Sequence, residues 1–208
     1  MATTTILGLT LTLSPPALTA LRLAPLLGST GSLTHAYMEW LTTTSFLHTP
    51  RTTSTLTLTM TQGKPSPSAT LVPNKDQIAA AKAIVIPIWF VNFFHTGLYS
   101  VIGLNGITTY TSLANILLFP TGLGLGKSWY VVGLAAAVGH YFFVPGVMGS
   151  VARLFDICVK GQAVEGEGRG DAVDCVREWV GVHKVRMLTV DLCAWVCFAV
   201  GVVRVLTP

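Results

Sequence analysis

The chain has 208 residues, of which 51% are hydrophobic and only 11% charged, and its mean hydropathy is +0.62. Soluble domains carry roughly 25% charged residues, so this composition argues against a soluble protein and favours a single small integral membrane domain. The net charge of +4 does not indicate nucleic-acid binding, because the basic residues are scattered and form no basic patch.

The first apolar stretch covers residues 6–27 and contains Pro15 and Pro16. It has no basic residue before it, so we expect a retained first span rather than a cleaved signal peptide. Because the two prolines disfavour a continuous helix, we predict that the helix begins at Pro16 and crosses the membrane over about 16–37.

A change to Thr, Ser and Pro then predicts a polar loop over residues 40–76. Alternation of Thr with apolar residues at 54–60 has the period of a strand and is compatible with a short hairpin. Asp76 lies in a capping sequence, so the second span is predicted over 78–101, with a kink at Pro87.

Residues 83–152 carry one formal charge, Lys127, although they include two histidines and three asparagines. Amides and imidazoles are costly in lipid, so we expect them to face the interior of a helical bundle. These residues are Asn92, His95, Asn105, Asn115 and His140. Within this region, residues 112–119 fit a re-entrant piece, the end of a bent helix or a packed loop.

The third span is predicted over 129–149, and Gly139, Pro145 and Gly146 predict close packing or a break late in it. A hydrophilic connector follows over 150–185. It comprises an amphipathic continuation to Lys160, a turn at 161–170 and a helix that begins at Asp171. The last span covers 186–206. The predicted fold is therefore all-α, an integral membrane four-helix bundle.

Lysines and arginines gather in the loop at 40–76 and in the connector at 150–185. The positive-inside rule places both on one side, favoured as cytoplasmic, with both termini opposite. We expect a multi-pass protein of the endoplasmic reticulum or another endomembrane.

Trp179, His183 and Arg186 are spaced four and three residues apart, so they share one face of the last helix at the membrane boundary. Together they can bind an aromatic or anionic ligand. Interfacial anchoring explains the same residue types equally well. Asp191 lies deeper among apolar residues and needs a partner, for which we predict Arg22 of the first span. This pair is either structural or catalytic.

His95 and His140 lie on spans that a short hairpin would make neighbours. Neutral imidazoles in a low-dielectric cavity can act as general bases, although a structural role or haem ligation is also compatible with them. His35 and Glu39 are one turn apart, so they predict a hydrogen-bonded pair or two thirds of a metal site.

Three segments together resemble the anthrone oxygenase-like family of small four-helix membrane proteins, many of them fungal. They are residues 87–97 (PIWFVNFFHTG), the span 133–145 with His140, and residues 178–186 (EWVGVHKVR). The resemblance covers about residues 80–206. It implies oxidation of a polyketide anthrone to the quinone by molecular oxygen, with no bound metal or flavin.

The residue roles follow from this resemblance. His95 or His140 would be the base, Arg186 would stabilise the phenolate, and Trp89 or Trp179 would stack on the rings. The predicted catalytic residues are His95, His140, Arg186 and Asp191, and the predicted substrate-binding residues are Trp89, Asn92, Asn105, Trp179 and His183. Expected partners are a hydrophobic small molecule, membrane lipid and other enzymes of the pathway, with no nucleic acid. A membrane cyclase or isomerase, or a non-catalytic scaffold, is the alternative.

Overall fold

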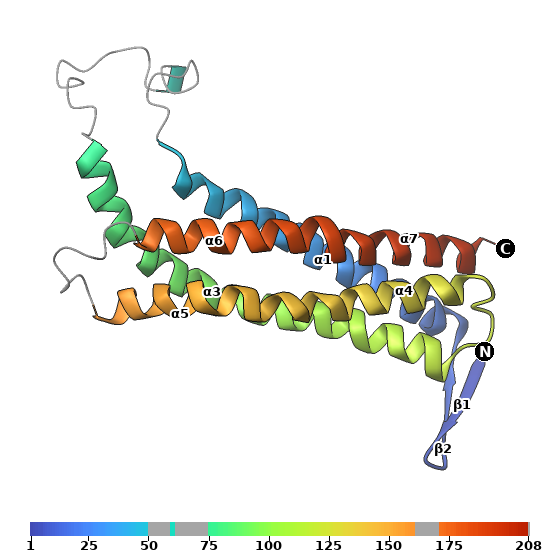
Figure 1. The fold of residues 1–208 in the computed structure, drawn as a ribbon. Coiled ribbons are helices and arrows are strands. Elements are labelled where there is room, and N and C mark those ends of the chain that lie inside the picture. Colours follow the sequence, from blue (N-terminus) through green and yellow to red (C-terminus); the bar gives the residue numbers. More distant parts are fainter. Residues whose placement is uncertain (50–58, 61–74, 161–170, 208) are drawn as a thin grey trace.

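The computed structural model describes residues 1–49, 59–60, 75–160 and 171–207. Helices run lengthwise as four long rods, and a small β-hairpin lies at the end that carries both termini (Figure 1). The predicted helical bundle is therefore confirmed, whereas the hairpin is an addition to the all-α prediction. Both termini lie at one end of the bundle, as the predicted topology requires.

The hairpin pairs β1 (Ala2–Ile6) with β2 (Leu9–Leu13) in antiparallel register, with Ala2 opposite Leu13. Its turn residues Leu7 and Gly8 both have positive φ, the backbone that a two-residue hairpin turn needs. Alternating Thr and Leu gives these strands their period of two. The first part of the apolar stretch that begins at residue 6 therefore forms the hairpin, and its second part forms a helix.

Helix α1 covers Pro15–Leu47, so it begins next to the predicted Pro16 but extends ten residues beyond the predicted end at Tyr37. The first part of the predicted polar loop is thus helical. Its threonines are accommodated there, since the buried hydroxyl of Thr43 donates a hydrogen bond of 2.6 Å to the carbonyl of Glu39 within the helix. Residues 50–58 and 61–74 of that loop, with most of the possible hairpin at 54–60, lie outside the described residues, and residues 75–76 are helical.

Helix α3 covers Lys75–Leu113 and continues into a π-helical turn, η1, over Ala114–Leu118. Of the three possibilities for residues 112–119, the end of a long helix is the one observed. Pro87 lies inside α3, and the helix is bent near its start (Figure 1).

The third rod consists of α4 (Gly126–Gly139), a 3₁₀ turn η2 (His140–Phe143) and α5 (Val144–Lys160). The predicted break near Gly139 and Pro145 is this 3₁₀ turn. The fourth rod consists of α6 (Asp171–Arg186), a π-helical turn η3 (Met187–Asp191) and α7 (Leu192–Leu206). Most of the predicted connector at 150–185 is therefore helix, and its turn at 161–170 lies outside the described residues.

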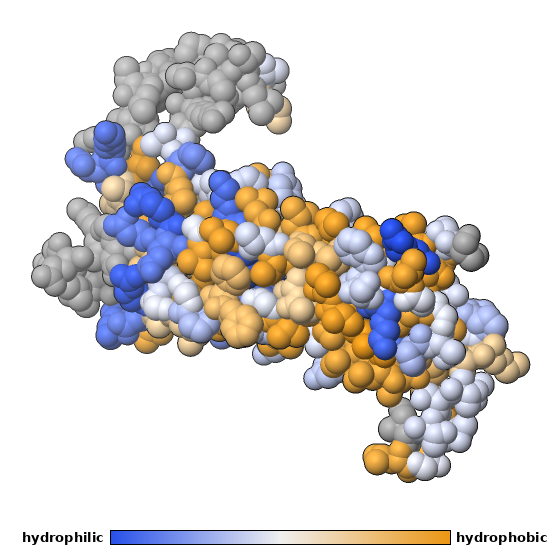
Figure 2. Space-filling view, turned by 45° about the vertical axis from the view of Figure 1, so that its right-hand side comes forward, coloured by the Kyte–Doolittle hydropathy of each residue, from blue (hydrophilic) through white to orange (hydrophobic). Residues whose placement is uncertain are grey.

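Three of the rods in the described part of the chain are long and apolar enough to cross a membrane: Lys75–Leu118, Gly126–Lys160 and Ala172–Leu206. Helix α1 is not among them, so the four-span prediction is confirmed for three helices. Hydrophobic side chains cover most of the visible face of the bundle, and hydrophilic ones gather towards the end opposite the termini (Figure 2). This surface fits contact with lipid.

Two apolar clusters hold the rods together. One surrounds Phe90, Leu154 and Trp179, and the other surrounds Tyr130 and Phe198. The irregular turns η2 and η3 lie midway along their rods and touch each other through His140 and Asp191.

Candidate functional site

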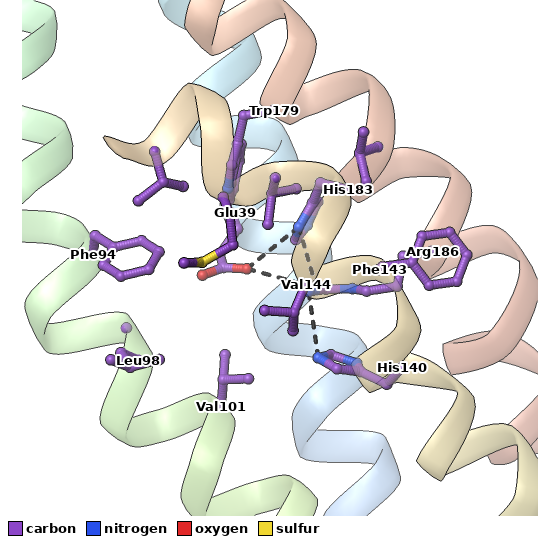
Figure 3. Close-up of a pocket in the computed structure, with 15 residues that line it drawn as sticks. Glu39, Phe94, Leu98, Val101, His140, Phe143, Val144, Trp179, His183 and Arg186 are labelled. Carbon is purple, nitrogen blue, oxygen red and sulfur yellow. Dashed lines mark hydrogen bonds and ion pairs between the residues drawn. The ribbon is translucent and has the colours of Figure 1, made fainter. Parts of the chain in front are cut away.

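A cavity of about 140 Å³ lies in the middle of the bundle, and every rod contributes to its wall (Figure 3). Its lining is apolar except for four side chains that carry or can carry charge: Glu39 from α1, His140 from η2, and His183 and Arg186 from α6. The apolar part of the wall comes mainly from α3 and α5. The residues concerned are Phe94, Gly97, Leu98, Val101, Phe143, Val144, Val147, Met148, Val151, Trp179 and Val182.

Arg186 is the centre of the polar wall. One terminal nitrogen lies 3.4 Å from Nε2 of His140, and the other lies 3.1 Å from Nδ1 of His183. Its Nε forms an ion pair of 3.3 Å with Asp191, and Glu39 lies 4.0 Å from the guanidinium. Two carboxylates therefore lie within ion-pair distance of this half-buried cation, and they supply the counter-charge that a low-dielectric site requires.

The π-helical turn η3 explains why Asp191 reaches Arg186. In an α-helix, residues five apart point in different directions, whereas a π turn closes an i to i+5 ring and places such residues above one another. The helical irregularity therefore positions an ion pair that regular helical spacing would separate.

The hydrogen-bond partners assign the form of both histidines. The carboxylate of Asp191 accepts from Nδ1 of His140 at 2.9 Å, and the carbonyl of Ala36 accepts from Nε2 of His183 at 2.8 Å. The second nitrogen of each ring therefore has a lone pair, and each lone pair faces Arg186. Both imidazoles are neutral acceptors in this arrangement.

Trp179 completes this side of the wall, because its indole stacks on the ring of His183 with centroids 4.6 Å apart. Trp179, His183 and Arg186 share one face, as their spacing predicts. Trp179 and His183 are 5% and 2% exposed, so interfacial anchoring does not describe them.

Glu39 differs from the other polar groups because its nearest partners are all at ion-pair distance. Its carboxylate lies 3.5 Å from Nδ1 of His35 and 3.7 Å from Nδ1 of His183. A Cβ added at Gly97 would lie 3.3 Å from Oε1 of Glu39, so the absence of a side chain at Gly97 leaves space beside the carboxylate.

Five of the predicted site residues are brought together: His140, Trp179, His183 and Arg186 line the cavity, and Asp191 contacts two of them. His95 and Asn92 are exposed and lie outside this group, so the expectation that they face the interior is wrong. The reason is helical phase, since the face of α3 that reaches the cavity carries Phe94, Gly97, Leu98 and Val101.

Trp89 and Asn105 also lie away from the cavity. Trp89 stacks on Phe93 and packs against Phe46, within the apolar cluster around Phe90. Asn105 is buried but is absent from the cavity wall. These two substrate-binding predictions therefore find no support in the geometry.

The predicted pair of Arg22 and Asp191 is wrong. Arg22 donates hydrogen bonds of 2.7 and 3.0 Å to the carbonyls of Thr121 and Gly122 in the turn before α4. Asp191 instead contacts His140 and Arg186. Matching depths along two apolar segments could not reveal that the π turn supplies Asp191 with a cation from its own rod.

Glu39 is the functional candidate that the predicted catalytic set omits. Its signal in the sequence is the spacing with His35, whose Nδ1 lies 3.5 Å from its carboxylate, an ion-pair contact rather than the predicted hydrogen bond. The alternative role of that pair, in a metal site, gains no third ligand, because no group of three or more His, Cys, Asp or Glu residues suited to a metal occurs among the described residues.

Comparison with known proteins gives two curated relatives, both fungal. The chain is 29% identical over 79 residues to the epoxidase pydX of an Acremonium species, and 35% identical over 79 residues to the epoxidase gkaX of Penicillium citrinum. These matches cover 38% and 36% of the chain, and 43% and 41% of the relatives. No family model matches the chain. No solved structure matches it either.

Proposed function

We propose that this protein is a membrane enzyme that oxidises a hydrophobic aromatic precursor of the anthrone type with molecular oxygen, in the biosynthesis of a polyketide-like secondary metabolite. The single observation that carries the proposal is the cavity itself, an apolar slot with a base and a cation on one wall. Similarity to two fungal epoxidases supports oxidative chemistry.

The chemistry needs few groups from the protein. A base removes a proton from the activated CH₂ group of the precursor. The electron pair delocalises onto the carbonyl oxygen, where Arg186 stabilises the negative charge. The carbanion adds O₂ and is protonated to a hydroperoxide. Loss of the remaining C–H proton with cleavage of the O–O bond then gives the quinone carbonyl and one molecule of water. Oxygen is the only co-substrate in this scheme, which uses no bound metal or flavin.

The position of the cavity supports a substrate that arrives through the lipid. Leu98 of α3 and Val144 and Met148 of α5 line the cavity, and they are 41%, 43% and 58% exposed on the outer surface of the bundle. Side chains that line the cavity and are also exposed on the outer surface would form a lateral entrance from the bilayer. A flat, apolar molecule dissolved in the membrane can reach the polar wall by this path.

Epoxidation is the second candidate, and the printed activity of the two relatives favours it. It differs in its products, because one oxygen atom enters the substrate and the other leaves as water with two electrons from a reductant. A cyclase or isomerase would use the same base and cation without consuming oxygen.

The test uses the purified protein in lipid nanodiscs with anthrone as the probe and ¹⁸O₂ as the oxidant. We expect anthraquinone that carries one ¹⁸O atom, at a rate well above the reaction without protein and insensitive to a metal chelator. Probe that gains one oxygen atom without losing hydrogen would indicate monooxygenation, the stoichiometry of an epoxidase, in place of oxidation to the quinone. Turnover that consumes no oxygen would indicate a cyclase or isomerase, and absence of turnover would contradict the proposal for this class of precursor.

A further inference from the structure

We infer that Glu39 of α1, rather than either buried histidine, is the base that takes the proton from the substrate. This inference rests on the proposed function and assigns its first chemical step to a residue that the sequence-based set of catalytic residues omits. It follows from a comparison of the acceptor atoms in the polar wall, namely the ring nitrogens of His140 and His183 and the carboxylate oxygens of Glu39.

Neither histidine offers a free lone pair to a ligand. His140 donates to Asp191 through Nδ1, and its Nε2 faces Arg186 at 3.4 Å. His183 donates to the carbonyl of Ala36 through Nε2, and its Nδ1 faces Arg186 at 3.1 Å. A ligand proton could reach these nitrogens only after the guanidinium had moved away, which would remove the cation that must stabilise the product anion.

Glu39, by contrast, has carboxylate oxygens that are open to a ligand in the cavity. Its carboxylate lines the cavity, and its partners His35, His183 and Arg186 lie 3.5 to 4.0 Å away. These distances are long for hydrogen bonds but short enough for the surrounding charge to hold the carboxylate in place. The oxygens of Glu39 can therefore accept a proton from a bound molecule, and no hydrogen bond of Glu39 has to break first.

The separation of base and cation matches a particular kind of substrate. Oε2 of Glu39 lies 4.0 Å from a terminal nitrogen of Arg186. In a six-membered ring, a CH₂ group and the oxygen of the carbonyl opposite it are about 4 Å apart, given a C=O bond of about 1.2 Å. Such a molecule, placed along the wall, puts its acidic C–H against Glu39 and its oxygen against Arg186.

In this step the carboxylate forms an O–H bond as the C–H bond breaks. The C–H electron pair moves through the ring onto the carbonyl oxygen, which becomes the anion beside Arg186. No electron leaves the substrate until O₂ adds, so the step can be observed without oxygen. His140 and Asp191 act as positioning residues, because they hold Arg186 in register through its nitrogens.

The experiment separates this proton transfer from oxidation. Anthrone labelled with deuterium at its CH₂ group is incubated anaerobically in ordinary water with nanodisc-embedded protein, and loss of deuterium is followed by mass spectrometry. Oxidation of the same probe in air is measured in parallel. The variants are Glu39→Gln, Glu39→Asp, His140→Gln and, as a matched control, Glu178→Gln, whose carboxylate is exposed on α6 and paired with Arg153.

We expect Glu39→Gln to lower both deuterium loss and oxidation at least 100-fold, the usual contribution of a general base. Glu39→Asp should restore part of both rates, because it returns a carboxylate to the wall, and this variant also reports on the role of Glu39 if the Gln variant is unstable. His140→Gln removes a positioning residue and should lower deuterium loss by less than Glu39→Gln does, whereas Glu178→Gln should match the wild type.

Two results would overturn the inference while leaving the proposed function intact. One is a Glu39→Gln variant that folds and keeps its rates within threefold of the wild type. The other is oxidation by the wild type with neither deuterium loss nor a deuterium isotope effect. Wild-type protein that accelerates neither reaction would instead contradict the proposed function for this probe.

Discussion

The space beside Gly97 gives a sharp test of the position of Glu39. An added methyl group at this residue of α3 would lie 3.3 Å from Oε1 of Glu39 and 3.7 Å from Cε1 of His35, so the carboxylate must yield by a few tenths of an ångström. A misplacement of 1 Å can cost about 100-fold in rate, so a shift of about 0.3 Å corresponds to about fourfold. We therefore expect Gly97→Ala to lower the rate of anthrone oxidation about fourfold.

The free energy of unfolding of the Gly97→Ala variant should rise or stay unchanged, although its rate of oxidation falls. Replacing Gly by Ala inside a helix stabilises it by about 0.5–1 kcal/mol. Gly103 provides the matched control, because it lies in the same helix and a methyl group there would meet no atom within 4 Å.

The assay pairs oxygen consumption with thermal unfolding of both variants in the same nanodiscs. A Gly97→Ala variant that is as active as Gly103→Ala would refute the placement of the reacting atoms beside Glu39. Equal loss of rate in both variants would refute it as well.

Three further predictions concern the ion pairs, the packing and the entrance. Asp191→Asn, followed by chemical denaturation, should lower the free energy of unfolding by about 1.5–3 kcal/mol, because it weakens a buried charge-assisted hydrogen bond to His140; an unchanged value would contradict the pairing. Gly28→Ala should lower the free energy of unfolding by about 1–3 kcal/mol, because its Cβ would lie 2.5 Å from Oγ1 of Thr108 and 3.1 Å from the Thr108 backbone nitrogen. In the same unfolding assay the control is Gly149→Ala in α5, whose methyl group would meet no atom within 4 Å and which should lose no stability. Leu98→Trp should raise KM for anthrone more than it lowers kcat if the entrance lies between α3 and α5, whereas an unchanged KM would place the entrance elsewhere.

The long apolar helices were predictable because their composition and spacing act locally. Pro15 and Pro16 fix where α1 begins, and Gly139 with Pro145 marks the irregular turn in the third rod. The end of α1 was not predictable from polarity. Thr43 is polar in the sequence, yet its hydroxyl is hydrogen-bonded within the helix, so a Thr-rich composition does not by itself mark the end of a helix.

The candidate site was partly predictable for the same reason. Trp179, His183 and Arg186 obey helical spacing, whereas the phase of α3 decides that His95 points outward. The contact between Asp191 and Arg186 depends on a π-helical turn, and no local residue pattern predicts such a turn. Glu39 emerges as a base only when the lone pairs of His140 and His183 are seen to face Arg186.

Photolabelling with anthraquinone tests most directly whether the cavity receives a flat aromatic molecule. On near-ultraviolet irradiation the bound quinone abstracts hydrogen from adjacent C–H bonds and forms covalent adducts, which peptide mass spectrometry locates. We predict adducts within residues 94–101 and 143–151, the two apolar walls of the cavity, and their suppression by excess anthrone. Adducts confined to the outward face of α7, or adducts at the cavity that anthrone does not suppress, would contradict the account.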